Sequence, residues 1–224
     1  MVLSLVLAES SIELVPNELV NHPSILSSAR RNGRNPRTLI LDQSYHHAAI
    51  LQLGPSGDRR GRPDIAHLSL LAALGSPLSL EEGLRSYVHT RNDMIITVDS
   101  KTRLPRNTGR FTSLLEQLYH EKKVPYSGRP LLSLKSGSLR SLLREISGDL
   151  VVALTTEGTL QPMDVVAAKL AEYGNPVVLV GGFPRGHFSR EVTSSANEIY
   201  RISRHSLDAW TVVARAIYDY EKTD

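Results

Sequence analysis

Residues 177–189 read VVLVGGFPRGHFS, and residues 202–210, a short distance further on, read ISRHSLDAW. The first segment begins as a buried strand and turns at a pair of glycines, and the second leads into a terminal helix. Gly181, Gly182 and Gly186 let bare backbone approach a bound molecule where a Cβ would collide. A strand end followed by such a loop predicts a ligand pocket that offers main-chain donors and acceptors to a flat heterocycle.

Arginines are concentrated in the first half of the chain. Guanidinium groups suited to phosphate occur at Arg59, Arg60, Arg62, Arg103, Arg106 and Arg110. Residues 59–110 contain nine Lys and Arg against five Asp and Glu, although the whole chain has a formal charge of only +3. A second basic run consists of Arg30, Arg31, Arg34 and Arg37, and it fits a solvated face as well as a phosphate-binding one. A pocket together with a basic surface favours an enzyme that acts on nucleic acid.

Length and composition limit the class of protein. With 224 residues and 41% hydrophobic content, the chain is long enough for one elaborated domain over residues 1–224. The absence of cysteine excludes disulfides and thiolate metal sites and permits a reducing compartment. The apolar start, Met1–Ala8, lacks a basic leader and is expected to be a buried first strand. No apolar run reaches the roughly 18 residues that span a bilayer, so we expect a soluble, cytoplasmic protein.

The order of apolar runs predicts an α/β fold. Helical patterns alternate with strand-like runs, which indicates a parallel sheet flanked by helices. Residues 87–90 and 94–98 flank Arg91-Asn92-Asp93 and predict a β-hairpin inserted near residues 84–100. The other expected strands are residues 2–7, 38–41, 151–154, 177–180 and 199–202.

Four helices have recognisable ends or faces. One is expected from Pro23 to Gly33 and another from Pro63 to Gly75, because proline favours a first turn and glycine an end. Thr108 is expected to cap a third through Tyr119, whose core face includes Phe111 rather than offering it to a base. The last helix, residues 206–220, is apolar on several faces, which favours contact with a partner subunit.

Four blocks of residues occur together and in order. They are RPDIAH at Arg62–His67, RLPR at Arg103–Arg106 with Arg110-Phe111, VGGFPRG at Val180–Gly186, and Ile202–Leu207. With these blocks the chain resembles, over nearly its whole length, the ribosomal small-subunit pseudouridine N1-methyltransferases of the SPOUT superfamily. These are ribosome-biogenesis proteins essential for mitotic growth in eukaryotes, and the compact chain is similar to their archaeal members.

The resemblance implies a parallel sheet with a C-terminal trefoil knot, a homodimer packed through the terminal helix, and S-adenosylmethionine bound in the knot. It also implies methylation of N1 of a pseudouridine in an rRNA stem-loop, with no metal and no membrane. The implied catalytic residues are Asp64 and Arg62. The implied RNA-binding residues are Arg62, Asp64, Arg103, Arg106 and Arg110. The implied cofactor-binding residues are Leu154, Gly181, Gly186, Ile202, Ser203, Arg204, His205, Ser206 and Leu207.

Three interpretations are open for Asp64. Pseudouridine loses a ring proton when its N1 is methylated, and Asp64 is the nearest candidate general base. However, Arg62 and a position in the first turn of a helix both favour the ionised carboxylate, which is a weak base. Asp64 is therefore favoured as an anchor that holds the Arg62 guanidinium in a fixed pose, with proton abstraction as the alternative. A plain capping carboxylate is the third interpretation.

Other site types fit less well. The glycine loop matches neither G-x-G-x-x-G nor a G-K-[ST] phosphate loop. Tyr45, His46 and His47 suggest a metal, but adjacent side chains on a helix diverge, so surface or RNA-facing polar groups are favoured. Two alternative functions remain: an RNA-binding ribosome-assembly factor whose methyl transfer is dispensable, and a related knotted methyltransferase that modifies a ribose or a purine.

Overall fold

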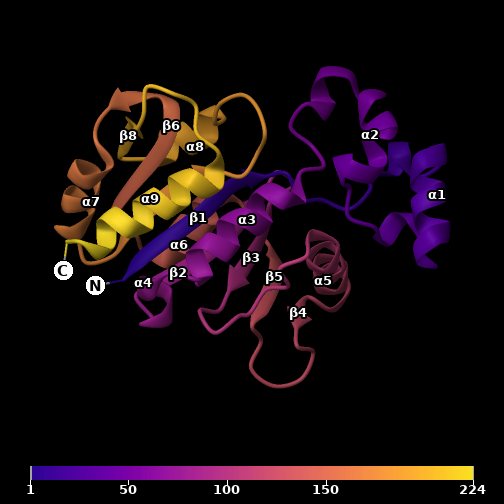
Figure 1. Cartoon of the computed structure of the whole chain (residues 1–224), viewed down its shortest axis with the longest axis horizontal. Coiled ribbons are helices and arrows are strands. Elements are labelled where there is room, and N and C mark those ends of the chain that lie inside the picture. The colour runs from indigo at the N-terminus through magenta and orange to yellow at the C-terminus, as the bar shows by residue number, and fades with distance from the viewer. Residues whose placement is uncertain (1, 224) are drawn as a thin grey trace.

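The computed structural model describes residues 2–223, in which one eight-stranded sheet is flanked by helices (Figure 1). The strand order is β4-β5-β3-β2-β1-β7-β6-β8. The strands are β1 (Leu3–Ser10), β2 (Leu84–Thr90), β3 (Met94–Val98), β4 (Lys123–Val124), β5 (Leu132–Ser136), β6 (Leu150–Leu160), β7 (Pro176–Gly181) and β8 (Glu198–Arg201).

The sheet is mixed. Strands β2, β1, β7, β6 and β8 pair in parallel, as the alternating pattern predicts. The expected strands of residues 87–90 and 94–98 fall in β2 and β3, which pair antiparallel. The sheet then continues antiparallel through β5 and β4, two short strands that the sequence analysis did not anticipate. The prediction of a sheet that is parallel apart from one hairpin is therefore wrong for the edge formed by β3, β5 and β4.

Helices cover both faces of the sheet. Alternate residues of β1 point to opposite sides, so Leu5 packs with α3, α5, α7 and α9, whereas Val6 packs with α6 and α8. Both faces of β1 are thereby buried, which explains its nearly continuous apolar run. The helices concerned are α3 (Pro63–Leu74), α5 (Thr108–Glu121), α6 (Leu139–Ile146), α7 (Met163–Ala171), α8 (Arg190–Ser195) and α9 (Ala209–Glu221), with α4 (Pro77–Leu80) after α3.

Residues 11–62 form a separate helical lobe at the right of Figure 1. Its helices α1 (Pro23–Asn32) and α2 (Gln43–Leu51) enclose an apolar cluster of their own. Three 3₁₀ turns complete the lobe, at Asn17–Leu19, Pro36–Thr38 and Gly54–Gly57. The lobe connects β1 to α3, and so places the Arg59–Arg62 segment beside the sheet.

Some element boundaries differ from the predictions. Residues 38–41 form no strand, because Pro36 begins a 3₁₀ turn and only Ile40 makes a bridge, to Leu14. The α5 helix begins at Thr108, but its cap is Asn107, whose side chain accepts a hydrogen bond from the Arg110 N–H.

The predicted ends of α1 and α3 are confirmed: Pro23 and Pro63 stand in their first turns, and Gly33 and Gly75 follow their last residues. The last helix begins at Ala209, later than the expected Ser206. Among residues 2–223, no helix is both long enough and apolar enough to cross a membrane.

Candidate active site

A cavity of about 320 Å³ opens where β7 and β8 end, beside the middle of β6. One wall is formed by residues 181–188 at the end of β7, which we call the cofactor loop after the role that the sequence analysis expects for it. A second is the segment from Arg201 to Ala209 between β8 and α9, and a third is the start of α3 with Arg62 and Ile65. The carboxyl ends of parallel strands are the usual place for a ligand in an α/β sheet. The cavity therefore lies where the sheet topology favours a binding site.

The cofactor loop is held against the end of β1 by backbone hydrogen bonds. The Gly182 N–H donates to the Ala8 carbonyl at 2.9 Å, and the Ser11 N–H donates to the Gly182 carbonyl at 2.9 Å. A Cβ on Gly182 would lie 2.0 Å from Ser10 Oγ and 2.9 Å from Ser10 Cα, so only glycine fits. Gly186 has φ +84°, a conformation that side chains disfavour. The loop can therefore follow this path only because positions 182 and 186 are glycines, which have no Cβ.

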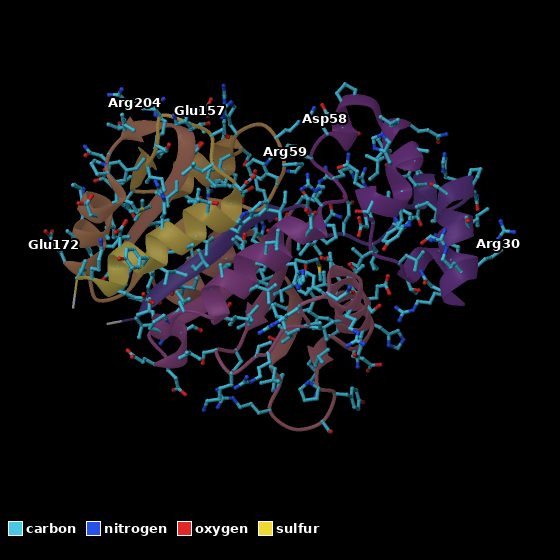
Figure 2. The ribbon with its side chains drawn as sticks, in the orientation of Figure 1. Arg30, Asp58, Arg59, Glu157, Glu172 and Arg204 are labelled. Atoms are coloured by element: carbon cyan, nitrogen blue, oxygen red, sulfur yellow. The ribbon has the colours of Figure 1, made fainter. Side chains whose placement is uncertain are left out.

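Most residues predicted to bind the cofactor lie around this cavity. Those that line it are Leu154, Gly181, Gly186, Ile202, Ser203, His205, Ser206 and Leu207. Arg204 is exposed and absent from the lining, and its side chain points outward in Figure 2. The lining fits a strand-end cradle built largely from loop backbone.

Sequence reasoning missed several residues that line the same cavity: Thr155, Thr156, Phe183, Pro184, Arg185, Phe188, Arg201, Asp208 and Trp210. Thr155 and Thr156 follow directly after the predicted strand end at Leu154, which was the available signal. Arg201 is the most informative of the set, because its Nε is buried and has no hydrogen-bond partner among residues 2–223. A guanidinium donor without a partner, on a residue that lines a cavity, favours a ligand that carries an acceptor such as a carboxylate.

Arg62 and Asp64 form a two-pronged ion pair at the start of α3. Arg62 Nε donates to Asp64 Oδ1 at 2.8 Å, and Arg62 Nη2 donates to Oδ2 at 2.7 Å. These hydrogen bonds raise the pKa of Arg62, against the opposing effect of its partial burial. Both side chains are about one-third exposed, and Arg62 lines the cavity while Asp64 does not. The guanidinium is thereby fixed at the edge of the cavity.

Arg103, Arg106 and Arg110 are exposed on the segment that leads into α5. Within residues 2–223 none of their guanidinium groups has a hydrogen bond or ion pair. The segment is tied to α3 by the buried side chain of His67, whose Nε2 lies 2.6 Å from the Pro105 carbonyl. His67 also stacks on Phe111, with 4.4 Å between ring centroids, which confirms that Phe111 is a core residue. His67 therefore connects the Arg62 helix to the Arg103–Arg110 segment.

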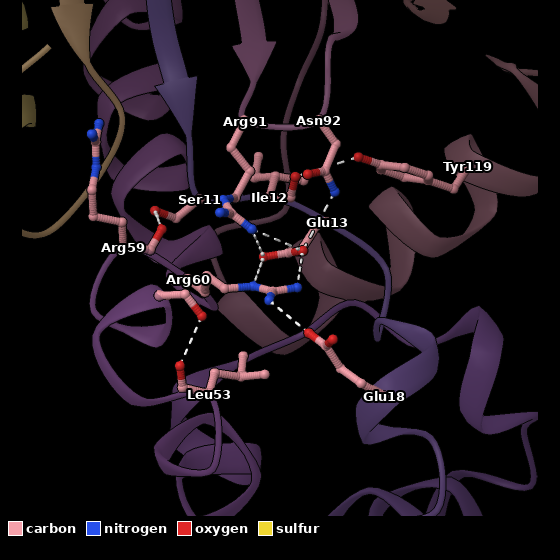
Figure 3. A network of polar contacts seen from close by, with 11 residues as sticks. Ser11, Ile12, Glu13, Glu18, Leu53, Arg59, Arg60, Arg91, Asn92 and Tyr119 are labelled. Carbon is pink, nitrogen blue, oxygen red and sulfur yellow. Dashed lines mark hydrogen bonds and ion pairs between the residues drawn. The ribbon is translucent and has the colours of Figure 1, made fainter. Parts of the chain in front are cut away.

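Arg60 is not available to phosphate, contrary to the sequence prediction. It is 7% exposed and clasps the buried carboxylate of Glu13 with two hydrogen bonds, of 2.8 and 2.6 Å (Figure 3). Arg91 and Asn92 from the β2–β3 turn contact the same carboxylate, and Glu18 accepts from Arg60 at 3.2 Å. We call these five residues the Glu13 network. It joins the end of β1, the Arg59–Arg62 segment and the β2–β3 turn.

Arg59, the residue before Arg60, connects the Arg59–Arg62 segment to the cofactor loop. Its Nη2 donates to Glu9 at 2.8 Å and its Nη1 to the His187 carbonyl at 3.1 Å. Its guanidinium also lies 3.7 Å from the centre of the Phe183 ring. In Figure 2, Arg59 lies between the helical lobe and the C-terminal half. The two walls therefore meet through Arg59.

The three residues Tyr45, His46 and His47 separate by exposure. Tyr45 and His47 are exposed, but His46 is only 2% exposed, so the prediction of a surface group is wrong for His46. Its Nδ1 accepts a hydrogen bond from the Asp42 N–H at 3.0 Å, which draws the ring into the lobe. In the part of the chain that the structure describes, no group of three or more His, Cys, Asp or Glu side chains is placed to hold a metal ion.

The chain matches known proteins over nearly its whole length. Residues 5–221 match the model of the EMG1/NEP1 methyltransferase family. Two proteins named ribosomal RNA small subunit methyltransferase Nep1 are similar to it. The one from Pyrococcus furiosus is 46% identical, over 98% of this chain and 96% of its own length. The one from Thermococcus kodakarensis is 45% identical, over 98% and 97% respectively.

A solved structure is also similar. Archaeoglobus fulgidus Nep1, bound to S-adenosylhomocysteine, superposes with a TM-score of 0.88 at 33% identity. The match covers 100% of this chain and 99% of that one.

Proposed function

This chain belongs to the EMG1/NEP1 methyltransferase family, and from that premise we propose that it methylates N1 of a pseudouridine in small-subunit rRNA, with S-adenosylmethionine as the methyl donor. We place this reaction in ribosome biogenesis in the cytoplasm. The observation that carries the proposal is that Arg62, from the basic first half of the chain, lines the same cavity as Gly181 and Gly186 from the cofactor loop. A cofactor cradle and a phosphate-binding group are thus joined at one opening.

The cavity suits S-adenosylmethionine in chemistry as well as size. Loop backbone at residues 202–207 offers donors and acceptors to an adenine edge, as flat heterocycles require. The buried Nε of Arg201 is a donor that an amino-acid carboxylate would satisfy. The related Archaeoglobus fulgidus protein binds S-adenosylhomocysteine, which is the same molecule after loss of the methyl group.

Positioning is the main task of the residues around the reacting atoms. The donor supplies a methyl carbon bonded to a positively charged sulfur, and a bond from N1 to that carbon forms as the sulfur–carbon bond breaks. Holding the two reactants in line is worth up to roughly 7–11 kcal/mol in favourable cases. The N1 proton must also leave. Because both oxygens of Asp64 are engaged by Arg62, we assign Asp64 the anchoring role and assign the proton to water at the open mouth.

RNA binding is assigned to Arg62 with its anchor Asp64, and to the exposed Arg103, Arg106 and Arg110. Free guanidinium groups bind phosphate through paired hydrogen bonds, and their contribution falls as salt rises. A methylated base must leave its stack, so we propose that a stem-loop presents the pseudouridine turned outward. The His67–Pro105 hydrogen bond supports this assignment, because it connects the Arg62 helix to the other three arginines.

The finer features of the fold are part of the proposal. We infer one SPOUT methyltransferase domain over residues 1–224, with the β2–β3 hairpin as an insertion near residues 84–100. We also infer a trefoil knot in its C-terminal part. Support comes from β6, which lies between β7 and β8, so the chain crosses back over β6 after β7.

A homodimer through α9 is also proposed. Tyr218 and Leu68 are exposed large apolar side chains, and both line a shallow groove between α9 and α3 together with Trp210. Exposed apolar surface of this kind favours a symmetric partner. Sedimentation of the wild type against Tyr218→Asp tests it: a dimer that becomes a monomer is expected, and a wild-type monomer contradicts it.

The test of function uses a synthetic hairpin that contains one pseudouridine, with labelled S-adenosylmethionine. We expect methyl transfer to that hairpin and none to a hairpin with uridine at the same position. Nucleoside mass spectrometry then identifies the product. Equal labelling of both hairpins contradicts the base assignment, and a methylated ribose or purine favours a different specificity. Cofactor and RNA binding without any transfer favours the assembly-factor alternative.

A further inference from the structure

A second cavity, of about 270 Å³, lies between the helical lobe and α5 and shares no residue with the cofactor cavity. It is bordered by the end of α1, the first turns of α2 and the first turns of α5. The residues that the argument uses are Arg31, Arg34, Asp42, Tyr45, His46 and Glu116. None of the contacts that hold the cofactor loop involves them.

His46 lines this cavity, and its ring carries a donor without a partner. Because its Nδ1 accepts from the Asp42 N–H at 3.0 Å, the proton of the neutral ring is on Nε2. Burial lowers the pKa of His46 despite the opposing charge of Asp42, so the ring is neutral near pH 7. Nε2 is buried and has no hydrogen-bond partner among residues 2–223. A donor left in this state needs an acceptor that the chain does not supply.

The carboxylates of the cavity are already occupied. Glu116 Oε1 accepts from the Ile40 N–H at 3.2 Å, and its Oε2 accepts from Arg34. Asp42 Oδ1 accepts from the Ser44 N–H at 2.8 Å. Two carboxylates disfavour a phosphate deep in the cavity. They leave room for a neutral group that carries an acceptor for His46.

The mouth suits a nucleotide. Tyr45 is 55% exposed, and its ring offers a face for stacking. Arg31 is exposed, and Arg34 is 41% exposed, so both cations are placed at the rim where a phosphate stays in solvent. An acceptor group inside, an aromatic face at the mouth and cations at the rim match the base, ring face and phosphate of one unpaired nucleotide.

The cavity is also continuous with the proposed RNA surface. The residue after Asp42, Gln43, donates its N–H to the Gly61 carbonyl at 2.7 Å, directly before Arg62. On the other side, Arg34, Ser113 and Glu116 also line a shallow groove that continues to Arg110. The cavity thus shares part of its lining with the groove that holds Arg110, and its α2 side is bonded to the residue before Arg62.

We propose that this cavity is a second nucleotide subsite, which receives an unpaired base of the rRNA stem-loop near the methylated nucleotide. The inference rests on the proposed function, because it takes rRNA as the substrate. His46 Nε2–H donates to a carbonyl oxygen or ring nitrogen of that base, Tyr45 stacks on it, and Arg31 and Arg34 contact its phosphate. The subsite selects a sequence or loop shape outside the methylated nucleotide.

The test blocks the mouth with Ser113→Trp. Ser113 is exposed on α5, so the larger side chain does not disturb the core. The matched control is Ser27→Trp, an exposed serine on α1 that lines neither this cavity nor the adjacent groove. We expect Ser113→Trp to weaken hairpin binding about tenfold, the loss of one stacked base, with unchanged S-adenosylmethionine affinity. The control is expected to bind like the wild type.

Abasic substitutions along the loop identify the base. One position is expected to weaken binding to the wild type and to have no further effect on Ser113→Trp, because the blocked subsite has already lost that base. In ¹⁵N-histidine spectra, the His46 Nε2–H signal is expected to shift with the hairpin and not with the matching abasic hairpin.

Two results overturn the proposal. One is hairpin affinity of Ser113→Trp equal to that of Ser27→Trp. The other is an unchanged His46 signal, which would assign an ordinary buried water to Nε2. If these occur while the wild type still methylates the hairpin, the subsite alone is wrong. If the wild type neither binds nor methylates any hairpin, the proposed function fails as well.

Discussion

The cofactor loop is held in place by backbone hydrogen bonds, at positions where only glycine fits. The Arg59–Arg62 segment is instead held by ion pairs between side chains. On the first wall, the Gly182 backbone bonds to both Ala8 and Ser11. On the second, the Arg60 guanidinium is fixed by the Glu13 carboxylate. The difference matters for substitutions. A segment held through its backbone keeps its position when side chains change, except at glycine. A segment held by a buried ion pair loses stability when either charge is removed.

The largest effect is expected for Glu13→Gln. The change leaves Arg60 without its buried counter-charge, so that only the exposed Glu18 remains, and it weakens the contact to Arg91; breaking a buried pair in this way costs about 3–5 kcal/mol. Urea denaturation should show a loss of that size in the free energy of unfolding.

Glu18→Gln is the matched control, because Glu18 is the exposed partner of the same guanidinium. Removing it should cost under about 1 kcal/mol. If Glu13→Gln and Glu18→Gln cost the same, burial of the charge is not what holds this wall.

Gly182→Ala tests the opposite wall. The added Cβ would collide with Ser10, including its Cα, so the cofactor loop and the end of β1 must move apart. Overpacking of this kind costs about 1–3 kcal/mol. Calorimetric titration should also show weaker S-adenosylmethionine binding. Gly174→Ala is the control, since its nearest neighbour would be a side-chain oxygen at 3.5 Å. A Gly182→Ala protein that binds the cofactor normally would contradict the fixed path of the loop.

Asp64→Asn distinguishes an anchor from a base. As an anchor, Asp64 orients Arg62, so KM for RNA should rise about tenfold, as for a lost charge-assisted contact, with kcat little changed. As a base, its loss should lower kcat about a hundredfold or more. Steady-state kinetics separate these outcomes. Asp164→Asn is the control, because Asp164 is also a carboxylate in the first turn of a helix but is exposed and does not line the cofactor cavity.

The smallest effect is expected for His46. Its pKa is lowered by burial from the ordinary value of 6.5, so the unfolded chain binds the proton more readily. The stability that neutral His46 contributes is present above pH 6.5 and is lost as the pH falls through its lower folded pKa. Denaturation at about pH 7.5 and about pH 5.5 should therefore show a smaller drop for His46→Gln than for the wild type. An identical drop would contradict this.

The fold was predictable where one local rule decided the outcome. The apolar runs of β1, β7 and the first half of β6 are buried in the sheet and that of β8 is half-buried, so hydrophobic pattern alone located them. The strand β5 was missed because its five residues, LSLKS, are too short to distinguish from a loop. Residues 38–41 were misassigned because Leu39 and Leu41 pack into the helical lobe, while Ile40 makes only a single bridge.

The residues of the candidate site differ in the same respect: some have a local signal in the sequence, and others depend on partners that are distant in the chain. The glycine loop is a local signal, and the family resemblance named Gly181, Gly186 and Ile202–Leu207; these residues line the cavity, except Arg204. Arg60 was misread because its partner, Glu13, is distant in the chain, and sequence position says nothing about such a pair. The same reason hid the buried Nε of Arg201 and the cavity at His46.

The central position of β1 has a consequence for how the chain reaches this structure. One edge of β1 pairs with β2, but the other pairs with β7, so that Ser4 meets Val177 near the opposite end of the chain. During synthesis on the ribosome, the first strand must wait until most of the polypeptide has emerged. Contacts this distant slow folding and lengthen the time for which an apolar edge is exposed to aggregation. The edge of β1 that pairs with β7 is therefore the part of this strand that stays unpaired longest as the chain emerges.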